Sequence, residues 1–368
     1  MKRTRLLHII DAPYEGGAQE VILQLARTID RSRFSLQVVV LHGEGYFTEQ
    51  LRELEIPVRS LASRKSDPAV FFRLVAFLRR HRFDLIHTSL FFASLFGIIA
   101  SVLSLRGHRR FVWIHAHRAQ LPWYDFPVYR VLSLCCHRFI AQVPTSVEEL
   151  LENGIATKKI QLITIGFDPQ SLHRTDTDLR AEFGIPRNAP LISRVARFHP
   201  DKGVPELIDI MDLVWREVPE TWLLLVGGGP QETEIMHKIA VCSRPERIAF
   251  AGIRQDLYTI TECSDIVACS SSAEGLGMTN LAAVFLGVPV VSYNVGAVAL
   301  AVDDGENGYL IPPGDRNRFA EKTVQLLTDP LLRKRMGAQG RRIAYERFSI
   351  EKMVRELENS YLEVPTRK

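Results

Sequence analysis

The sequence predicts an α/β protein with two Rossmann-like domains, each built as a parallel sheet with helices on both faces. Three observations support this prediction. The chain has 368 residues, which is long for a single domain and favours two. Strand-length apolar runs alternate with helix-length amphipathic runs along the whole chain. Each half also begins in the same order, with a strand, a glycine-containing loop and a helix.

The strands are expected where short apolar runs occur without alternating polar residues, as in buried parallel sheets. The first half has five such runs, at 5–10, 35–41, 84–90, 110–116 and 138–143, and the second half has five more, at 190–196, 222–227, 247–252, 265–270 and 288–294. A polar stretch without periodicity, 168–178, indicates the boundary between the halves. We therefore expect domains at 1–172 and 173–345, and a C-terminal helix within 346–368 that packs back on the first domain.

The composition is that of an ordinary soluble globular protein, with 46% hydrophobic and 24% charged residues. The chain has five cysteines, but they form no C-x-x-C pair and no histidine cluster accompanies them, so we expect no metal site. An odd number of cysteines without a signal peptide is typical of a reducing cytoplasm. The longest uncharged run, 88–105, is interrupted by hydroxyl residues and a glycine. It favours a buried helix over a membrane-spanning one.

The net charge of +4 hides an asymmetry between the halves. Residues 1–170 carry a net charge of +7 and the remainder carries −3. The excess includes the basic amphipathic stretch 71–83 and the sequence RGHRR at 106–110. Two interpretations stay open: a solvated helix face, or a surface that binds anionic lipid. We expect no nucleic-acid partner, because no recognition motif accompanies the charge.

Three loops that follow strands in the second half have features of anion binding. The first offers Arg194, Arg197 and Lys202 at the end of its strand, and arginine and lysine bind phosphate oxygens. The second is VGGGP at 226–230, whose glycines allow close backbone approach. The third, 270–278, contains Glu274 and leads into a helix N-terminus. Together they predict a site for a nucleotide diphosphate.

The order of five motifs resembles the retaining glycosyltransferases of family four, which have the GT-B fold of two Rossmann-like domains facing across a cleft. The motifs are GGAQE (16–20), RFHPDKG (197–203), VGGGP (226–230), SSSAEGLG (270–277) and DDGENGYLIPPGD (303–315). The resemblance implies that 1–172 binds the acceptor and 173–345 the nucleotide-sugar donor. It implies transfer of the sugar to a hydroxyl of a glycan or lipid-linked acceptor, without metal or cofactor. It also implies a cytoplasmic enzyme on the inner face of the plasma membrane, with anionic lipid as a partner of the first domain.

The resemblance also assigns roles by position. Arg197 and Lys202 would neutralise the donor diphosphate and the charge that develops as it leaves. Glu274 would face the donor sugar. His117, or His115 beside it, would lie near the transferred sugar, and His87 nearer the acceptor or the core. The remaining donor-binding positions are glycines and their neighbours: Gly16, Gly17, Gly228, Gly229, Gly275, Leu276, Gly277 and Met278.

Three positions depart from the family pattern. Ala282 stands where a second glutamate usually holds the ribose, Leu300 stands where another glutamate is frequent, and Ile165 replaces an asparagine. The loss of a charged hydrogen bond to ribose would cost about 1.5–3 kcal/mol, or roughly 10- to 100-fold in donor affinity. Two alternatives therefore stay open: a degenerate GT-B protein that binds a sugar nucleotide or a partner without turnover, and a nucleotide-sugar epimerase.

Overall fold

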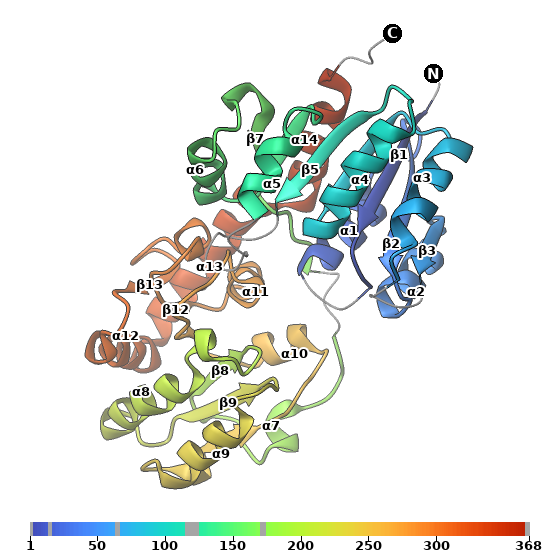
Figure 1. Cartoon of the computed structure of the whole chain (residues 1–368). Helices are drawn as coiled ribbons and strands as arrows, with labels where there is room; N and C mark the ends of the chain where they lie inside the picture. Colours follow the sequence, from blue (N-terminus) through green and yellow to red (C-terminus); the bar gives the residue numbers. More distant parts are fainter. Residues whose placement is uncertain (1–2, 14–16, 63–66, 115–124, 170–173, 365–368) are drawn as a thin grey trace. The chain divides into compact units, whose positions relative to one another are not determined.

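The structure is a computed structural model that describes residues 3–13, 17–62, 67–114, 125–169 and 174–364. By its contacts the chain divides into two units, each described here by itself (Figure 1). Unit 1 consists of Met1–Phe167 together with Phe348–Lys368, and unit 2 consists of Asp168–Arg347. Unit 1 is therefore made of two segments that are separated in the sequence by the whole of unit 2.

Unit 1 is built on a seven-stranded parallel sheet with the order β3-β2-β1-β4-β5-β6-β7. Its strands are β1 (Thr4–Ile10), β2 (Phe34–His42), β3 (Val58–Ala62), β4 (Leu85–Ser89), β5 (Arg109–Ile114), β6 (Arg138–Ala141) and β7 (Ile160–Leu162). Its helices are α1 (Gly17–Thr28), α2 (Tyr46–Glu53), α3 (Val70–Arg80), α4 (Phe91–Leu103), α5 (Asp125–Leu132), α6 (Pro144–Glu152) and α14 (Ile350–Glu363), and a 3-10 turn, η2, covers Thr157–Lys159.

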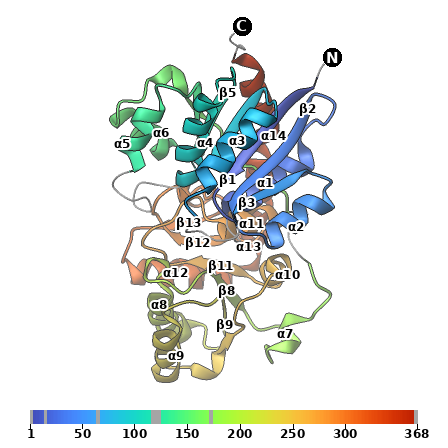
Figure 2. The ribbon, with the colours of Figure 1, turned by 45° about the vertical axis from the view of Figure 1, so that its right-hand side comes forward.

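The two faces of the sheet of unit 1 are covered by different helices. Alternate residues of a strand point to opposite faces. Leu7 and Ile9 of β1 belong to a core cluster with residues of α3 and α4, which lie side by side (Figure 2). His8 lies between them in the sequence, and its ring is 4.8 Å from that of His87, whose Nδ1 is 2.6 Å from the hydroxyl of Tyr361. Helix α14 therefore packs on the face opposite to α3 and α4.

Polar contacts also join α14 to unit 1. The backbone N–H of Asp30 donates to Oε1 of Glu358 at 2.8 Å. Arg138 of β6 donates to Oε2 of Glu363 at 2.9 Å and to the Ser360 hydroxyl at 3.1 Å. These contacts fix the position of α14 on the sheet, so the second segment of unit 1 is part of its fold.

Unit 2 is built on a six-stranded parallel sheet with the order β10-β9-β8-β11-β12-β13. Its strands are β8 (Leu191–Val195), β9 (Trp222–Val226), β10 (Ile248–Phe250), β11 (Ile266–Cys269), β12 (Val290–Tyr293) and β13 (Gly308–Ile311). Its helices are α7 (Leu179–Glu182), α8 (Val204–Glu217), α9 (Glu232–Val241), α10 (Leu257–Glu262), α11 (Met278–Leu286), α12 (Arg316–Thr328) and α13 (Pro330–Phe348), whose last residue belongs to unit 1. Three 3-10 turns are η4 (Pro200–Lys202), η5 (Pro245–Arg247) and η6 (Val298–Leu300).

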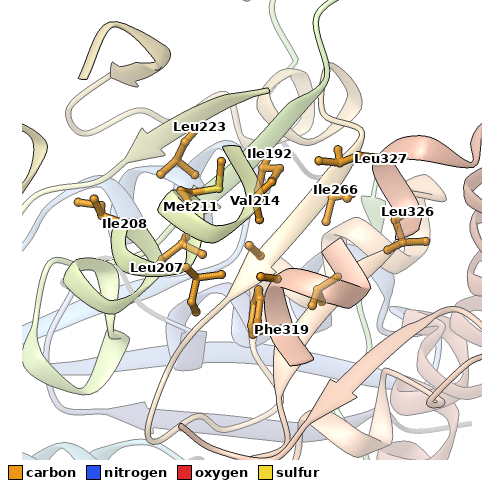
Figure 3. Packing of buried hydrophobic residues seen from close by; sticks show 14 of the residues in the cluster. Ile192, Leu207, Ile208, Met211, Val214, Leu223, Ile266, Phe319, Leu326 and Leu327 are labelled. Carbon is orange, nitrogen blue, oxygen red and sulfur yellow. The ribbon is translucent and has the colours of Figure 1, made fainter. Parts of the chain in front are cut away.

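The largest core cluster of unit 2 lies where α8 and α12 pack on one face of this sheet (Figure 3). Leu207 and Met211 are one helical turn apart on α8 and are buried against Ile192 of β8 and Ile266 of β11. Phe319 of α12 completes this layer. The opposite face has a separate cluster that includes Leu191 and residues of α7 and α10. Both faces of the sheet are therefore covered, which is why its strands are mostly apolar.

All ten predicted strands are present, and the structure adds three that the sequence did not predict: β3, β7 and β13. Each of the three lies at an edge of its sheet. The uncharged run 88–105 contains the end of β4 and the whole of α4. Helix α4 is packed on the sheet through residues such as Ala93 and Ala100, as the prediction of a buried helix requires. Among the described residues no helix is long and apolar enough to cross a membrane.

Both sheets reverse their strand order at one point, between β1 and β4 in unit 1 and between β8 and β11 in unit 2. In open parallel sheets, ligands bind at the carboxyl ends of the strands that flank such a reversal. In unit 2 the loops at this place are 196–203, after β8, and 270–277, after β11. These are the loops whose sequences predict anion binding.

Candidate functional site

The loops after β8 and β11 are joined through their backbones. Gly203 has φ +60°, and a Cβ atom at this position would lie 2.1 Å from the carbonyl oxygen of Ser270. The hydroxyl of Ser270 donates to the Gly203 carbonyl at 2.8 Å, and the N–H of Ser272 donates to the Asp201 carbonyl at 2.9 Å. Glycine is therefore favoured at 203 for two reasons: the backbone is left-handed there, and the loop after β11 approaches too closely for a side chain.

This contact brings Lys202 and Glu274 together. The Nζ atom of Lys202 lies 3.1 Å from Oε2 of Glu274 and 3.3 Å from Oδ2 of Asp201. Lys202 is only 9% exposed. The same Glu274 oxygen accepts a hydrogen bond from the Ser271 hydroxyl at 3.1 Å. The structure thus places two of the predicted site residues, from loops 72 positions apart in the chain, in one ion pair.

Asp201 is a further charged member of the site that the sequence analysis did not single out. Burial disfavours its ionised form, but the hydrogen bond from His199, at 2.6 Å, and the charge of Lys202 together lower the pKa of the Asp201 carboxyl. Asp201 is therefore anionic at neutral pH and shares Lys202 with Glu274. Its position one residue before the lysine was visible in the sequence, but its orientation depends on η4.

The three cations of the first loop occupy different environments. Arg197 is exposed, and its guanidinium forms no ion pair or hydrogen bond with the part of the chain that the structure describes. Arg194, in contrast, is 2% exposed and donates to the Lys202 carbonyl and to the Ser271 hydroxyl, each at 2.8 Å. Arg194 does lie near the end of β8, which finishes at Val195, but its side chain is buried and is not offered to a ligand. Arg194 holds the two loops together, and Arg197 remains available to a ligand.

The glycines of VGGGP allow the loop after β9 to pack closely against the loop after β8. Gly227 has φ +141°, and a Cβ atom there would lie 1.8 Å from the Ala196 carbonyl oxygen. Gly229 has φ +154°, and its Cβ atom would lie 2.6 Å from the Phe198 carbonyl oxygen. The carbonyl of Gly228 accepts a hydrogen bond from the N–H of Phe198 at 2.9 Å. The close backbone approach expected of these glycines is therefore present. It fixes the positions of Ala196 and Phe198, the two neighbours of Arg197 in the sequence.

The loop before α11 presents unused backbone donors. The N–H groups of Gly275, Leu276 and Gly277 find no acceptor within the described residues. Helix α11 begins at Met278, so this loop also carries the positive end of the helix dipole. Gly296 packs directly against this loop, since a Cβ atom at 296 would lie 1.7 Å from the Glu274 carbonyl oxygen. Free donors beside a helix N-terminus suit a phosphate or a hydroxylated ligand.

Asn280, in the first turn of α11, is a polar residue that the sequence analysis did not single out. It is 1% exposed, and neither atom of its amide has a hydrogen-bond partner in the described structure. Its Nδ2 atom lies against Gly277. The only signal in the sequence was an asparagine within an otherwise apolar helix.

Two of the three departures from the family pattern lie in buried positions. Ala282 is fully buried within α11, and Ile165 is 7% exposed. Leu300 is half-buried at the end of η6. A side chain at 282 is surrounded by protein atoms, so a glutamate at this position would not face an open cleft.

The predicted site residues of the first half are only partly described. Gly16, His115 and His117 lie outside the described residues, and Gly17 is the first residue of α1. His87 is fully buried and its Nδ1 contacts the Tyr361 hydroxyl of α14, which favours the packing role over the acceptor role. No group of three or more residues that could hold a metal ion is found among the described residues.

Two protein-family models match nearly the whole chain. The model described as "Glycosyltransferase Family 4" matches residues 15–171, and the model described as "Glycosyl transferases group 1" matches residues 175–343. The division between the two matches falls close to the boundary between units 1 and 2.

Two curated relatives illustrate how much of the chain is matched. The chain is 30% identical over 208 residues to N-acetyl-alpha-D-glucosaminyl L-malate synthase of Bacillus anthracis, covering 56% of this chain and 54% of that protein. It is 24% identical over 339 residues to the putative glycosyltransferase EpsD of Bacillus subtilis, covering 88% of each chain. With the first curated relatives, the match spans about half of their length.

Solved structures share the fold over almost the whole chain. A crystal structure of Anabaena HepE in complex with UDP and glucose has a TM-score of 0.86 at 22% identity, covering 98% of this chain and 100% of that one. Sucrose-phosphate synthase from Thermosynechococcus elongatus has a TM-score of 0.78 at 19% identity, covering 98% and 99%. The two family matches show that the chain belongs to the glycosyltransferases of family 4, and the structural likeness, together with the two parallel sheets, shows that it has the GT-B fold.

Proposed function

We propose that the protein transfers a sugar, with retention of configuration, from a nucleotide-sugar donor to a hydroxyl of a glycan or lipid-linked acceptor. The observation that carries this proposal is the joining of Lys202 and Glu274 in one ion pair, with the exposed Arg197 and the free N–H groups of the 274–278 loop in the same unit. Cations for a diphosphate and a carboxylate for sugar hydroxyls are the groups that this chemistry needs.

The ion pair suggests how the donor is bound. Lys202 is neutralised by Glu274 and Asp201. The donor diphosphate would replace the Glu274 carboxylate at Nζ of Lys202, because the diphosphate carries one negative charge on each of its two phosphates and the carboxylate carries one in all. Glu274 would then be free to accept hydrogen bonds from the sugar hydroxyls, with Ser271 still holding its other contact. Binding of the diphosphate and orientation of the sugar are coupled in this proposal.

The transfer step breaks the bond between the anomeric carbon and the donor phosphate oxygen and forms a bond to the acceptor oxygen on the same face of the sugar. The acceptor proton goes to the leaving phosphate. Arg197 and Lys202 would stabilise the negative charge as it develops on that phosphate, which is the role a metal has in other transferases. We therefore propose that the reaction needs no metal, and turnover that persists in excess EDTA would support this.

The other donor-binding positions remain part of the proposal. Gly228, Gly229 and the backbone of 275–278 would contact the donor, and Gly16 and Gly17 would let α1 approach the phosphate or the acceptor. His117 is proposed to lie near the transferred sugar. The relatives suggest polysaccharide acceptors, since they include a lipopolysaccharide core biosynthesis glycosyltransferase of Rhizobium meliloti and a capsular polysaccharide glycosyltransferase of Staphylococcus aureus.

The alternative is a GT-B protein that binds a sugar nucleotide or a partner without turnover, and it is favoured by Ala282 and Leu300, which stand where the family pattern has glutamates. Release of UDP from UDP-glucose in the absence of an acceptor distinguishes the two. We expect slow release by the wild-type protein and little release by Arg197→Ala. Binding of UDP-glucose without any release of UDP, at any protein concentration, would favour the alternative.

We also propose that the enzyme works at the cytoplasmic face of a membrane, bound to anionic lipid through unit 1. Arg79, Arg80 and Arg82 are exposed at the end of α3 and just after it. Each basic residue near an anionic surface contributes about 1 kcal/mol. The test is co-sedimentation with neutral and with anionic vesicles, in which the triple change to glutamate should abolish binding to the anionic ones. Equal recovery on both kinds of vesicle would contradict the proposal.

A further inference from the structure

A small basic cavity lies between β3 and α3 in unit 1. Its volume is about 190 Å3. The residues that matter for its chemistry are Arg59, Ser60, Arg73, Phe77, Arg80 and His81. None of them belongs to the motifs that identify the family, and the cavity is in a different unit from the loops that carry Lys202 and Glu274.

The cations converge because of their spacing on two elements. Arg73, Phe77 and Arg80 are four and three residues apart on α3, so they lie on one face of the helix. Arg59 comes from β3, the edge strand of the sheet that runs alongside. Arginine side chains from a strand and from two successive turns of a helix therefore surround the same space.

Phe77 forms an apolar support for these charges. It is 5% exposed. The guanidinium carbon of Arg59 lies 5.6 Å from the centroid of its ring, which is a cation–π distance. The ring of His81 lies 4.5 Å from the same centroid. Stacking on Phe77 orients Arg59 and His81 without using their N–H groups, which stay available to a ligand.

The cavity has an excess of positive charge. Arg73 is neutralised and anchored, since it donates to Oδ2 of Asp67 at 2.7 Å and to the Leu61 carbonyl at 2.8 Å. Arg59 and Arg80 form no ion pair with any residue of the described ranges. Two guanidinium groups without counter-ions among the described residues therefore line one cavity, an arrangement that favours an anionic ligand.

We propose that this cavity binds a phosphate group, either on a lipid headgroup or on a soluble phosphate compound. A phosphate monoester carries up to two charges and three acceptor oxygens, which match two unpaired guanidinium groups better than the single charge of a carboxylate. The volume is below the 300–1,000 Å3 typical of pockets for drug-sized ligands, so it suits a small charged group rather than a whole nucleotide. This inference does not depend on the sugar-transfer reaction.

The test compares two variants of the full chain that lose the same charge. Arg59→Gln with Arg80→Gln removes the two unpaired cations of the cavity. Arg3→Gln with Lys158→Gln removes two exposed cations of the same unit that do not line the cavity and lie outside the basic stretch 71–83. Both pairs are made in an Arg197→Ala background, which weakens phosphate binding at the donor loops. Unchanged thermal denaturation of the variants shows that they are folded.

Two probes separate the possible sources of the phosphate. The first is inorganic phosphate, titrated calorimetrically at an ionic strength held constant with chloride. The second is a phosphatidylcholine vesicle with or without phosphatidic acid. We expect the cavity variant to bind inorganic phosphate at least about tenfold more weakly and the matched variant to change by less than about twofold, since a hydrogen bond to a charged group is worth roughly 1.5–3 kcal/mol.

The outcome on vesicles then assigns the source. Loss of binding to phosphatidic acid vesicles by the cavity variant alone assigns a lipid headgroup. Retained vesicle binding, together with lost phosphate binding, assigns a soluble phosphate compound. Equal losses in the two variants would mean that only the general positive field matters, and they would overturn the proposal, as would an absence of phosphate binding by the Arg197→Ala parent.

Discussion

Replacing Gly203 by alanine tests whether the contact between the loops after β8 and β11 builds the donor site. The matched control is Gly184→Ala. Both glycines have a left-handed conformation, with φ +60° at 203 and +65° at 184. A Cβ atom at 184 would meet nothing within 4 Å, whereas one at 203 would lie 2.1 Å from the Ser270 carbonyl oxygen. The two variants therefore share the backbone penalty, and only Gly203→Ala adds a collision.

The magnitudes follow from these contacts. Alanine in the left-handed region costs about 1–2 kcal/mol, which is the whole expected loss of stability for Gly184→Ala. At 203 the loops must also separate by more than 1 Å to reach an ordinary contact distance. This separation would break the hydrogen bonds of Ser270 and Ser272 to the first loop, each worth about 1 kcal/mol. We expect Gly203→Ala to lose about 3–4 kcal/mol of unfolding free energy.

The rate of UDP release should fall as well, because Lys202 is the residue before Gly203. A displacement of about 1 Å in a positioning group can cost roughly 100-fold in activity. The assay is urea denaturation combined with the rate of UDP release from UDP-glucose, measured for wild type and both variants. The reasoning is refuted if Gly203→Ala matches Gly184→Ala in both stability and rate.

Three further predictions concern single side chains. Arg197→Ala and Lys202→Ala should each remove most transfer activity. Only Lys202→Ala should also lower the thermal denaturation temperature, because it leaves Glu274 and Asp201 without their cation. Equal denaturation temperatures of the two variants would contradict this. Ala282→Glu should lower the unfolding free energy by about 3 kcal/mol or more, since it places a carboxylate where the side chain is fully buried, and a variant of wild-type stability with tighter UDP-glucose binding would show that the position opens to a ligand. Burial lowers the pKa of His108 below its usual value of 6.5, so the unfolded chain takes up a proton at this imidazole more readily than the folded chain. The free energy of unfolding should therefore fall as the pH drops below about 6.5, by at most about 1.4 kcal/mol per pH unit. In denaturation curves between pH 7 and 5, the free energy of unfolding of His108→Gln should depend less steeply on pH.

Most of the strands that could be predicted from the sequence have continuous apolar runs because they are buried on both faces, whereas the edge strand β10 was predicted although only its middle residue is buried. The edge strand β3 has half-buried or exposed residues at its first three positions, and β7 has none that is fully buried. An edge strand has a neighbour on one side only and needs fewer apolar residues, so these two segments do not differ from loops in composition. β13 contains Gly308 and half-buried Tyr309 and Leu310, which explains why it was missed as well.

The candidate site could be predicted as a set of loops but not as a set of contacts. Arg194 and Arg197 look alike in the sequence, since both belong to a short segment at the end of an apolar run. Their roles differ because β8 extends to Val195, which leaves Arg194 within the sheet and Arg197 outside it. Asp201 and Asn280 were missed for a related reason: their significance depends on burial and partners, which no local pattern expresses.

The composition of unit 1 from two chain segments has a consequence for the order of folding during synthesis. A ribosome delivers β1 to β7 first, then the whole of unit 2, and only then α14. Until α14 appears, His87 lacks the Tyr361 hydroxyl and Asp30 lacks the Glu358 carboxylate. Unit 2 is continuous in sequence and can complete its core as it emerges. The nascent chain therefore finishes its second unit before its first, and the sheet face that α14 covers stays open to chaperones or to other chains until α14 has been made.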